Sequence, residues 1–172
     1  DYYNSIISPF YSYSTGRTKE TLRSSQVTCR DIDDDGYIEI PEDTSSKKQS
    51  SEITSQNWVN YGNTVLSHKC YSFSCKRDGY ILVIDDDDFS KVKANYDSES
   101  RKLTIINKKN KSNVFEIVTL INSNYSVNDP KYKDYTMIMK NSGFVYLAKV
   151  NKSSDIDINI QTLKDMIKVY WF

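Results

Sequence analysis

The most apolar run of the chain is Val114-Phe115-Glu116-Ile117-Val118-Thr119-Leu120-Ile121. Its short length and its content of Val, Ile and Phe are typical of a buried β-strand, because a core helix is usually longer. We therefore expect residues 114–121 to form the central strand of a sheet. An Asn-, Pro- and Lys-rich segment at 122–134 follows as a connection.

Shorter strand candidates lie on both sides of this run and are joined by turn sequences. Residues 68–73 and 80–84 flank Arg77-Asp78-Gly79, and an Asp-Gly pair favours a hairpin because glycine adopts a positive φ at little cost. The pattern predicts a mainly antiparallel sheet. The other candidates are the segments 58–61 and 64–66, the pair 91–96 and 102–106, and the pair 135–139 and 144–150.

The end of the chain has a different periodicity, which approximates that of an amphipathic helix. Asp155 or Asp157 is available as its N-terminal cap, and a second, short helix is expected at 86–91. Strands followed by a closing helix predict the α+β class, with a mainly antiparallel sheet and a C-terminal helix. The apolar positions of the closing helix are Ile158, Ile160, Leu163, Met166, Ile167 and Tyr170.

The composition changes near residue 50. Residues 1–30 are rich in Tyr and Ser, and residues 43–51 form a polar stretch typical of a mobile connection. We therefore expect two parts: a small calcium-loop segment with strand-like flanks at 1–50, and an antiparallel α+β domain at 51–172.

The first of these parts contains an acidic loop, Asp31-Ile-Asp-Asp-Asp-Gly-Tyr-Ile-Glu-Ile-Pro-Glu42. Carboxylates at its first, third and fifth positions can converge on one hard cation if the backbone turns sharply, and the glycine at the sixth position permits that turn. The alternative is a solvated acidic turn whose charges are neutralised by Lys and Arg. We predict a structural calcium site, with ligands from Asp31, Asp33, Asp35, Glu39 and the backbone carbonyl of Tyr37.

The flanks of the loop decide which kind of calcium loop it is. All twelve positions fit an EF-hand, in which Glu42 would be the bidentate ligand. However, residues 37–40 alternate like a strand, and Pro41 ends that strand or confines it to a sheet edge. We therefore expect a β-flanked loop whose late ligand is Glu39 rather than Glu42.

From Asp31 to Glu39 the loop resembles the calcium loops of FG-GAP/VCBS-type repeats, as in integrin-like β-propeller blades, with Asp34 in place of the usual fourth-position glycine. A wider set of motifs is similar to the C-terminal part of uncharacterised secreted proteins of Gram-positive gut bacteria, which implies an extracellular or cell-surface location. The order of elements in 52–172 is similar to that of the PsbP-like α/β/α sandwich, a scaffold compatible with many functions. The wider motifs are Thr21-Leu-Arg-Ser-Ser25, the loop through Pro41, Trp58-x-Asn60-Tyr61 and Gly79-Tyr80-x-Leu82.

The overall composition narrows the expected partners. Lys plus Arg and Asp plus Glu both count 23, so no net charge attracts nucleic acid or an anionic membrane surface. No apolar run approaches the roughly 20 residues of a membrane helix, so we expect no membrane insertion, and any signal or anchor would lie upstream of Asp1. The 14 tyrosines and two tryptophans are typical either of strands with one solvent-exposed face or of a surface that binds an unidentified protein or glycan ligand.

Two further groups of residues are candidate metal sites. Cys29, Cys70 and Cys75 allow at most one internal disulfide, and an extended 71–74 would place the last two thiols on opposite faces, so we expect reduced thiols. His68 with Cys70 and Cys75 is a weak zinc pattern, because the chain has one His and no second Cys-x-x-Cys. The run Asp85–Asp88 lacks a glycine and alternating ligands, and it favours a charged helix start over a metal site.

Catalytic motifs are missing from the sequence. There is no Gly-x-Ser-x-Gly, no His-Glu-x-x-His and no glycine-rich phosphate loop among only five glycines. We therefore predict a non-catalytic interaction or structural module that carries a structural calcium ion. The alternative is a hydrolase of glycans or peptides whose site is built from scattered carboxylates, which a sequence does not reveal.

Overall fold

The computed structural model describes residues 27–44, 52–62, 65–126, 128–152 and 154–169, without the side chains of residues 61, 62 and 65. Within these ranges the chain forms two five-stranded antiparallel sheets, with strand orders β1-β2-β3-β4-β10 and β5-β6-β7-β9-β8. The first sheet contains β1 (Ile40–Asp43), β2 (Ile53–Gly62), β3 (Val65–Cys75), β4 (Tyr80–Ile84) and β10 (Ile167–Val169). The second contains β5 (Val92–Asp97), β6 (Lys102–Asn107), β7 (Asn113–Ile121), β8 (Thr136–Lys140) and β9 (Phe144–Val150).

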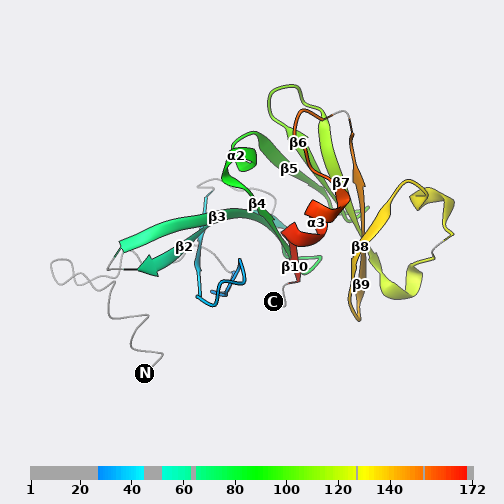
Figure 1. Cartoon of the computed structure of the whole chain (residues 1–172). Helices are drawn as coiled ribbons and strands as arrows, with labels where there is room; N and C mark the ends of the chain where they lie inside the picture. The colour runs from blue at the N-terminus through cyan, green and yellow to red at the C-terminus, as the bar shows by residue number, and fades with distance from the viewer. Residues whose placement is uncertain (1–26, 45–51, 63–64, 127, 153, 170–172) are drawn as a thin grey trace.

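Helices are a minor part of the structure. Among the described residues they are α2 (Asp86–Phe89), α3 (Ile160–Met166) and the 3-10 turns Asn122–Asn124 and Pro130–Tyr132. None of the helices in the described ranges is long and apolar enough to cross a bilayer. In Figure 1 the long β2–β3 hairpin extends away from the second sheet, and α3 packs beside β8 and β9.

The predicted α+β class is wrong, because the fold is mainly β. The expected closing helix is only seven residues long, and its cap is the Asn159 side chain, which accepts a hydrogen bond from the backbone N–H of Thr162, 3.0 Å away. Ile167 is already a strand residue and pairs with Leu82 of β4. Strand pairing with an apolar neighbour therefore overrides the helical periodicity at the end of the pattern.

Several predicted elements are confirmed. Residues 114–121 fall in β7, the third strand of five in its sheet. Gly79 has a φ of 68° in the β3–β4 hairpin, and the β5–β6 and β8–β9 hairpins have the expected partners. The short helix expected at 86–91 is α2, which ends at Phe89. The segment 58–61 and the described residues 65 and 66 of the segment 64–66 belong to one long hairpin, β2–β3, which pairs over ten residue positions with a bulge after Trp58.

The division at residue 50 stays a prediction, and part of it lies outside the described residues, as do residues 1–26 with the Thr21–Ser25 motif. The last strand of the first part, β1, hydrogen-bonds along β2, with Pro41 opposite Trp58. Because β1 has one neighbour in the sheet, Pro41 lies on an edge strand, where a missing N–H is tolerated.

The main core lies between the two sheets. On β4, Tyr80, Leu82 and Ile84 face this core, whereas Ile81 faces the opposite side of the first sheet. There it packs in a second apolar cluster with Val27, Ile32 and Trp58, all at most 1% exposed. The acidic loop is attached to the sheet through this cluster, because Ile32 is a loop residue.

A buried carboxylate connects the two sheets. Asp78, in the β3–β4 turn, is fully buried, and its Oδ1 lies 2.6 Å from Nη2 of Arg101, which directly precedes β6. Its Oδ2 accepts a hydrogen bond of 2.9 Å from the Tyr96 hydroxyl on β5, and its backbone carbonyl accepts one of 2.8 Å from Tyr146 on β9. These bonds compensate the cost of burying the charge.

Candidate metal centre

The acidic loop is closed by a pair of backbone hydrogen bonds. Arg30 and Glu39 form an antiparallel bridge, in which Arg30 N–H donates to the Glu39 carbonyl at 3.2 Å and Glu39 N–H donates to the Arg30 carbonyl at 2.9 Å. The flanks are thus extended rather than helical. β1 begins only at Ile40, so Tyr37 and Ile38, expected in a strand, belong to the loop.

Two residues with left-handed backbone conformations turn the chain inside the loop. Asp34 has a φ of 62° and Gly36 a φ of 89°. Asp34 thus keeps the conformation that a glycine at this position supplies, and Asp tolerates it better than most residues do. The Asp31 carboxylate accepts the N–H groups of Asp35 at 3.0 Å and Gly36 at 2.8 Å, which holds the turn in place.

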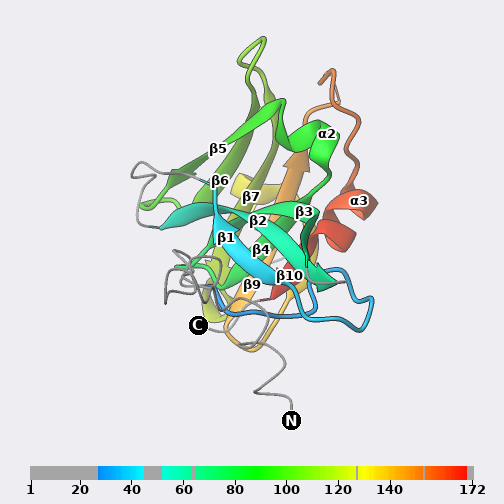
Figure 2. The same cartoon turned by 90° about the vertical axis from the view of Figure 1, so that its left-hand side faces the viewer.

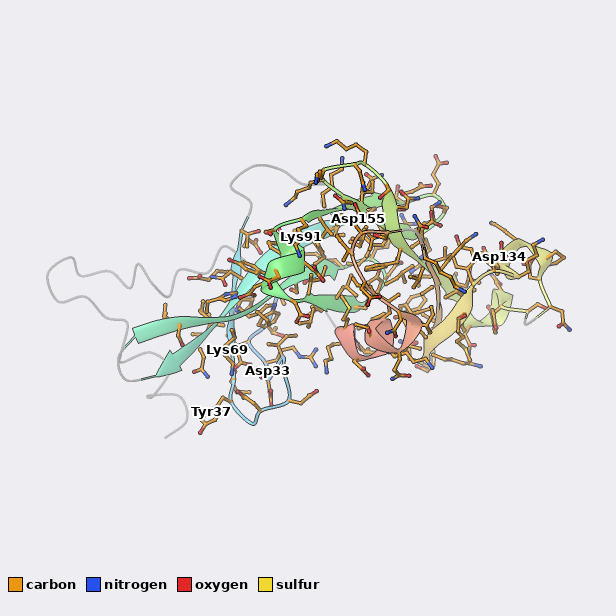
Figure 3. All side chains as sticks on the ribbon, turned by 45° about the horizontal axis from the view of Figure 1, so that its top comes forward. Asp33, Tyr37, Lys69, Lys91, Asp134 and Asp155 are labelled. Carbon is orange, nitrogen blue, oxygen red and sulfur yellow. The ribbon has the colours of Figure 1, made fainter. Side chains whose placement is uncertain are left out.

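This geometry brings four carboxylates together. One oxygen from each of Asp31, Asp33, Asp35 and Glu39 lies within 4.8 Å of the others, an arrangement that can hold a metal ion. The Tyr37 side chain is 66% exposed and points away from the loop, as Figure 3 shows, so this residue would contribute only its backbone carbonyl. Glu42 lies on β1, where its carboxylate accepts a hydrogen bond from Asn57 of β2.

Glu39 differs from the other three carboxylates because it is fully buried. Its Oε2 accepts the N–H of Ile32 at 3.0 Å, whereas Oε1 has no hydrogen-bond partner among the described residues. Burial raises the pKa of the Glu39 carboxyl, and the negative charges of Asp33 and Asp35 raise it further. A buried, unpartnered carboxylate oxygen is costly unless a cation or a proton neutralises it.

A lysine of β3 supplies part of the opposite charge. The Lys69 ammonium lies 3.1 Å from Oδ2 of Asp33 and 2.6 Å from Oδ2 of Asp35. Its hydrogen bonds to Asp35 and Asp33 raise the pKa of Lys69, and the same contact lowers the pKa of Asp35. Figure 3 shows Lys69 and Asp33 close together, on β3 and the loop.

Residues near the C-terminal strand hold the outer side of the loop. Nζ of Lys168 on β10 lies 2.6 Å from Oδ2 of Asp34 and lowers the pKa of that carboxyl. The Arg30 guanidinium donates to the Val169 carbonyl at 2.9 Å. Figure 2 shows the loop running below the first sheet toward β10. The loop is therefore fixed to the sheet on two sides.

The other candidate metal residues do not converge in the described part of the chain. Cys75 is buried in the main core, and Cys70 packs on the opposite face of the sheet with the second cluster, so no disulfide joins them. Burial raises the pKa of the Cys70 thiol to about 12. His68 lies beside Asp86, with Nε2 2.8 Å from its Oδ1. In Asp85–Asp88 the last three residues form the first turn of α2.

Sequence reasoning missed the two lysines and the buried Asp78. Lys69 is 34 residues from Asp35 and Lys168 is 134 from Asp34, so no local pattern connects these pairs. The Asp78-Gly79 pair indicated a turn, which is what it forms, but nothing in its surroundings indicated burial. The chain matches no protein-family model, and the searches of curated proteins and of solved structures found no match.

Proposed function

We propose that this chain is a non-catalytic extracellular or cell-surface module in which the acidic loop holds a structural calcium ion. The observation that carries the proposal is the buried Glu39 carboxylate, which has one oxygen without a partner and lies in a cluster with three further carboxylates. Oxygen ligands from carboxylates suit a hard cation such as calcium. Among the described residues, Lys69 is the lysine in contact with this cluster of four carboxylates, which leaves excess negative charge that a divalent ion would neutralise.

The position of the loop supports a structural role for the ion. The carboxylates come from one loop that packs on the first sheet through Ile32, and a cation would tie the Asp31 end of the loop to the Glu39 end. Binding to the folded state alone stabilises it by mass action. An exposed aromatic ring beside the site, Tyr37, supports the proposed protein or glycan partner, because such rings stack on sugars and fill interfaces.

The test is thermal unfolding with increasing calcium, after removal of metal with a chelator. At a calcium concentration about 100 times the Kd, stabilisation of about 2.7 kcal/mol would raise the Tm by about 5–10 °C. Asp33→Asn should abolish most of this rise. Asp134→Asn is the matched control, because Asp134 is an exposed carboxylate that also pairs with a lysine, far from the loop in Figure 3.

Magnesium should stabilise less than calcium, because it requires a smaller and more regular ligand shell. The proposal fails if millimolar calcium leaves the Tm of the unmodified chain unchanged. It also fails if Asp134→Asn reduces the calcium response as much as Asp33→Asn does.

A further inference from the structure

We propose that the Lys69 ammonium is a built-in competitor of the metal ion, which leaves the carboxylates when a divalent cation enters. This inference rests on the proposed calcium site and concerns how that site is regulated. Lys69 contacts two of the four converging carboxylates, at 2.6 Å and 3.1 Å. A calcium ion needs the same oxygens, at about 2.3–2.6 Å, so an ammonium and the ion repel each other at this position.

The geometry distinguishes Lys69 from the other lysine of the loop. Lys168 makes an equally short contact of 2.6 Å, but with Asp34, which is not one of the converging carboxylates. The ammonium-bearing side chains of both lysines are 27% exposed. The two residues therefore differ mainly in which carboxylates they contact, and this makes Lys168 a matched control.

The Lys69 ammonium has only a short distance to move from the carboxylates into solvent. Its side chain is long and flexible, it starts from a β-strand rather than from the loop, and part of it already contacts solvent. The ammonium can thus move into water while its backbone stays in the sheet. Glu39 has no such freedom, because it is buried and held by Ile32 N–H. Entry of the ion therefore exchanges a mobile monovalent charge for a fixed divalent one.

Competition of this kind lowers the apparent affinity for calcium. Each partly exposed ion pair contributes about 0.2–1 kcal/mol, so we expect removal of the Lys69 charge to tighten calcium binding by about tenfold. The result would place the unmodified loop toward the weak end of calcium sites, which suits the millimolar calcium outside cells. Lys69→Met is the variant of choice, because methionine keeps most of the aliphatic stem.

The first experiment measures calcium binding by titration calorimetry for the unmodified chain, Lys69→Met and Lys168→Met. The expected result is about tenfold tighter calcium binding for Lys69→Met and less than about threefold tighter binding for Lys168→Met. The Lys168 charge acts on the ion only from a distance, where salt screens it. Equal tightening in both variants would overturn the proposal, since it would be a general charge effect. Unchanged or weaker binding in Lys69→Met would also overturn it.

The second experiment follows the Lys69 ammonium itself. Acetic anhydride acetylates the exposed lysines, and mass spectrometry measures the rate at each of them. Calcium should increase the modification of Lys69 several-fold and leave that of Lys168 within about twofold. An unchanged Lys69 rate at saturating calcium would overturn the proposal and leave the calcium site intact. Absence of binding in both the unmodified chain and Lys69→Met would instead refute the calcium site.

Discussion

Two acidic stretches of this chain, residues 31–39 and 85–88, carry similar charge and have different structures. In the first, carboxylates alternate with other residues, and the positive φ angles of Asp34 and Gly36 turn them toward one point. In the second, four successive carboxylates lie at the start of a short helix, where Asp86 pairs with His68 and Asp88 with Lys91. Charge density alone therefore does not bring carboxylates together at one point. The spacing of the acidic residues and the handedness of the backbone do.

The largest expected effect comes from removing the apolar support of the first stretch. Trp58 is fully buried below the loop and donates a hydrogen bond of 2.8 Å to Ser72. Trp58→Ala should lower the free energy of unfolding by about 3–5 kcal/mol and reduce calcium binding, as measured by urea unfolding and calorimetry. Met137→Ala, at a position 44% exposed, should change stability by less than about 0.5 kcal/mol. A loss below about 1 kcal/mol for Trp58→Ala would contradict the packing described for the loop.

A smaller effect is expected from changing the handedness of the backbone. Gly36→Ala places a Cβ on a residue with a φ of 89°, where it has open space but a strained conformation. We expect a loss of about 1–2 kcal/mol and weaker calcium binding. Gly143→Ala is the control, because that glycine is outside the left-handed region and its Cβ would meet only Asn141, at 3.8 Å. Equal losses in the two variants would show that Gly36 has no special role.

The charge of Glu39 should make the stability of the folded chain depend on pH. Its raised pKa means that, without metal, the folded state binds the proton more tightly than the unfolded state. Stability from this group is therefore present below the ordinary Glu pKa and is lost as the pH rises through the raised value. In Glu39→Gln this loss should disappear, together with most of the calcium response.

Urea unfolding in a chelator, from about pH 4 to pH 8, measures the difference between the unmodified chain and Glu39→Gln. The lowered pKa values of Asp34 and Asp35 act in the opposite sense, because their contribution is lost as the pH falls. The two lysine contacts that cause these shifts are kept in both proteins, so the difference isolates Glu39 to a first approximation. Parallel stability curves for the two proteins would contradict a raised pKa.

The smallest effect is expected in the second stretch. Asp87 is exposed and lies in the first turn of α2, and Asp87→Asn should change stability by less than about 0.5 kcal/mol. Calcium binding should be unchanged in calorimetry. A marked loss of calcium binding would show that both stretches contribute to one site, and the contrast between them would be lost.

The strands and hairpins could be predicted from sequence because their signals are local. The apolar run at 114–121 and the Asp78-Gly79 turn each determine structure within a few residues. The end of the chain could not be predicted in this way. Its helical spacing continues through Ile167 to Tyr170, yet Ile167 pairs with Leu82, a contact that depends on β4 and not on its own neighbours.

For the candidate site, too, the local features could be predicted from the sequence and the distant contacts could not. The four carboxylates that meet are all members of the predicted ligand set, since spacing within one loop fixes their relative positions. Lys69 and Lys168 come from strands far along the chain, so only the order of strands in the first sheet reveals their contacts. The unpartnered oxygen of Glu39 likewise depends on burial, and Glu39 accepts a hydrogen bond from Ile32, a loop residue that packs in one cluster with Trp58 and Ile81.

The buried Asp78 has a consequence for how the chain folds. Its partners Arg101 and Tyr146 are 23 and 68 residues away, whereas each hairpin closes over a short loop, so we expect the hairpins to form before the two sheets dock. Until docking, the carboxylate stays hydrated. If the two sheets docked in a wrong register, this charge would be buried without Arg101, at a cost of several kcal/mol. Asp78 therefore favours the native alignment of the two sheets over other alignments.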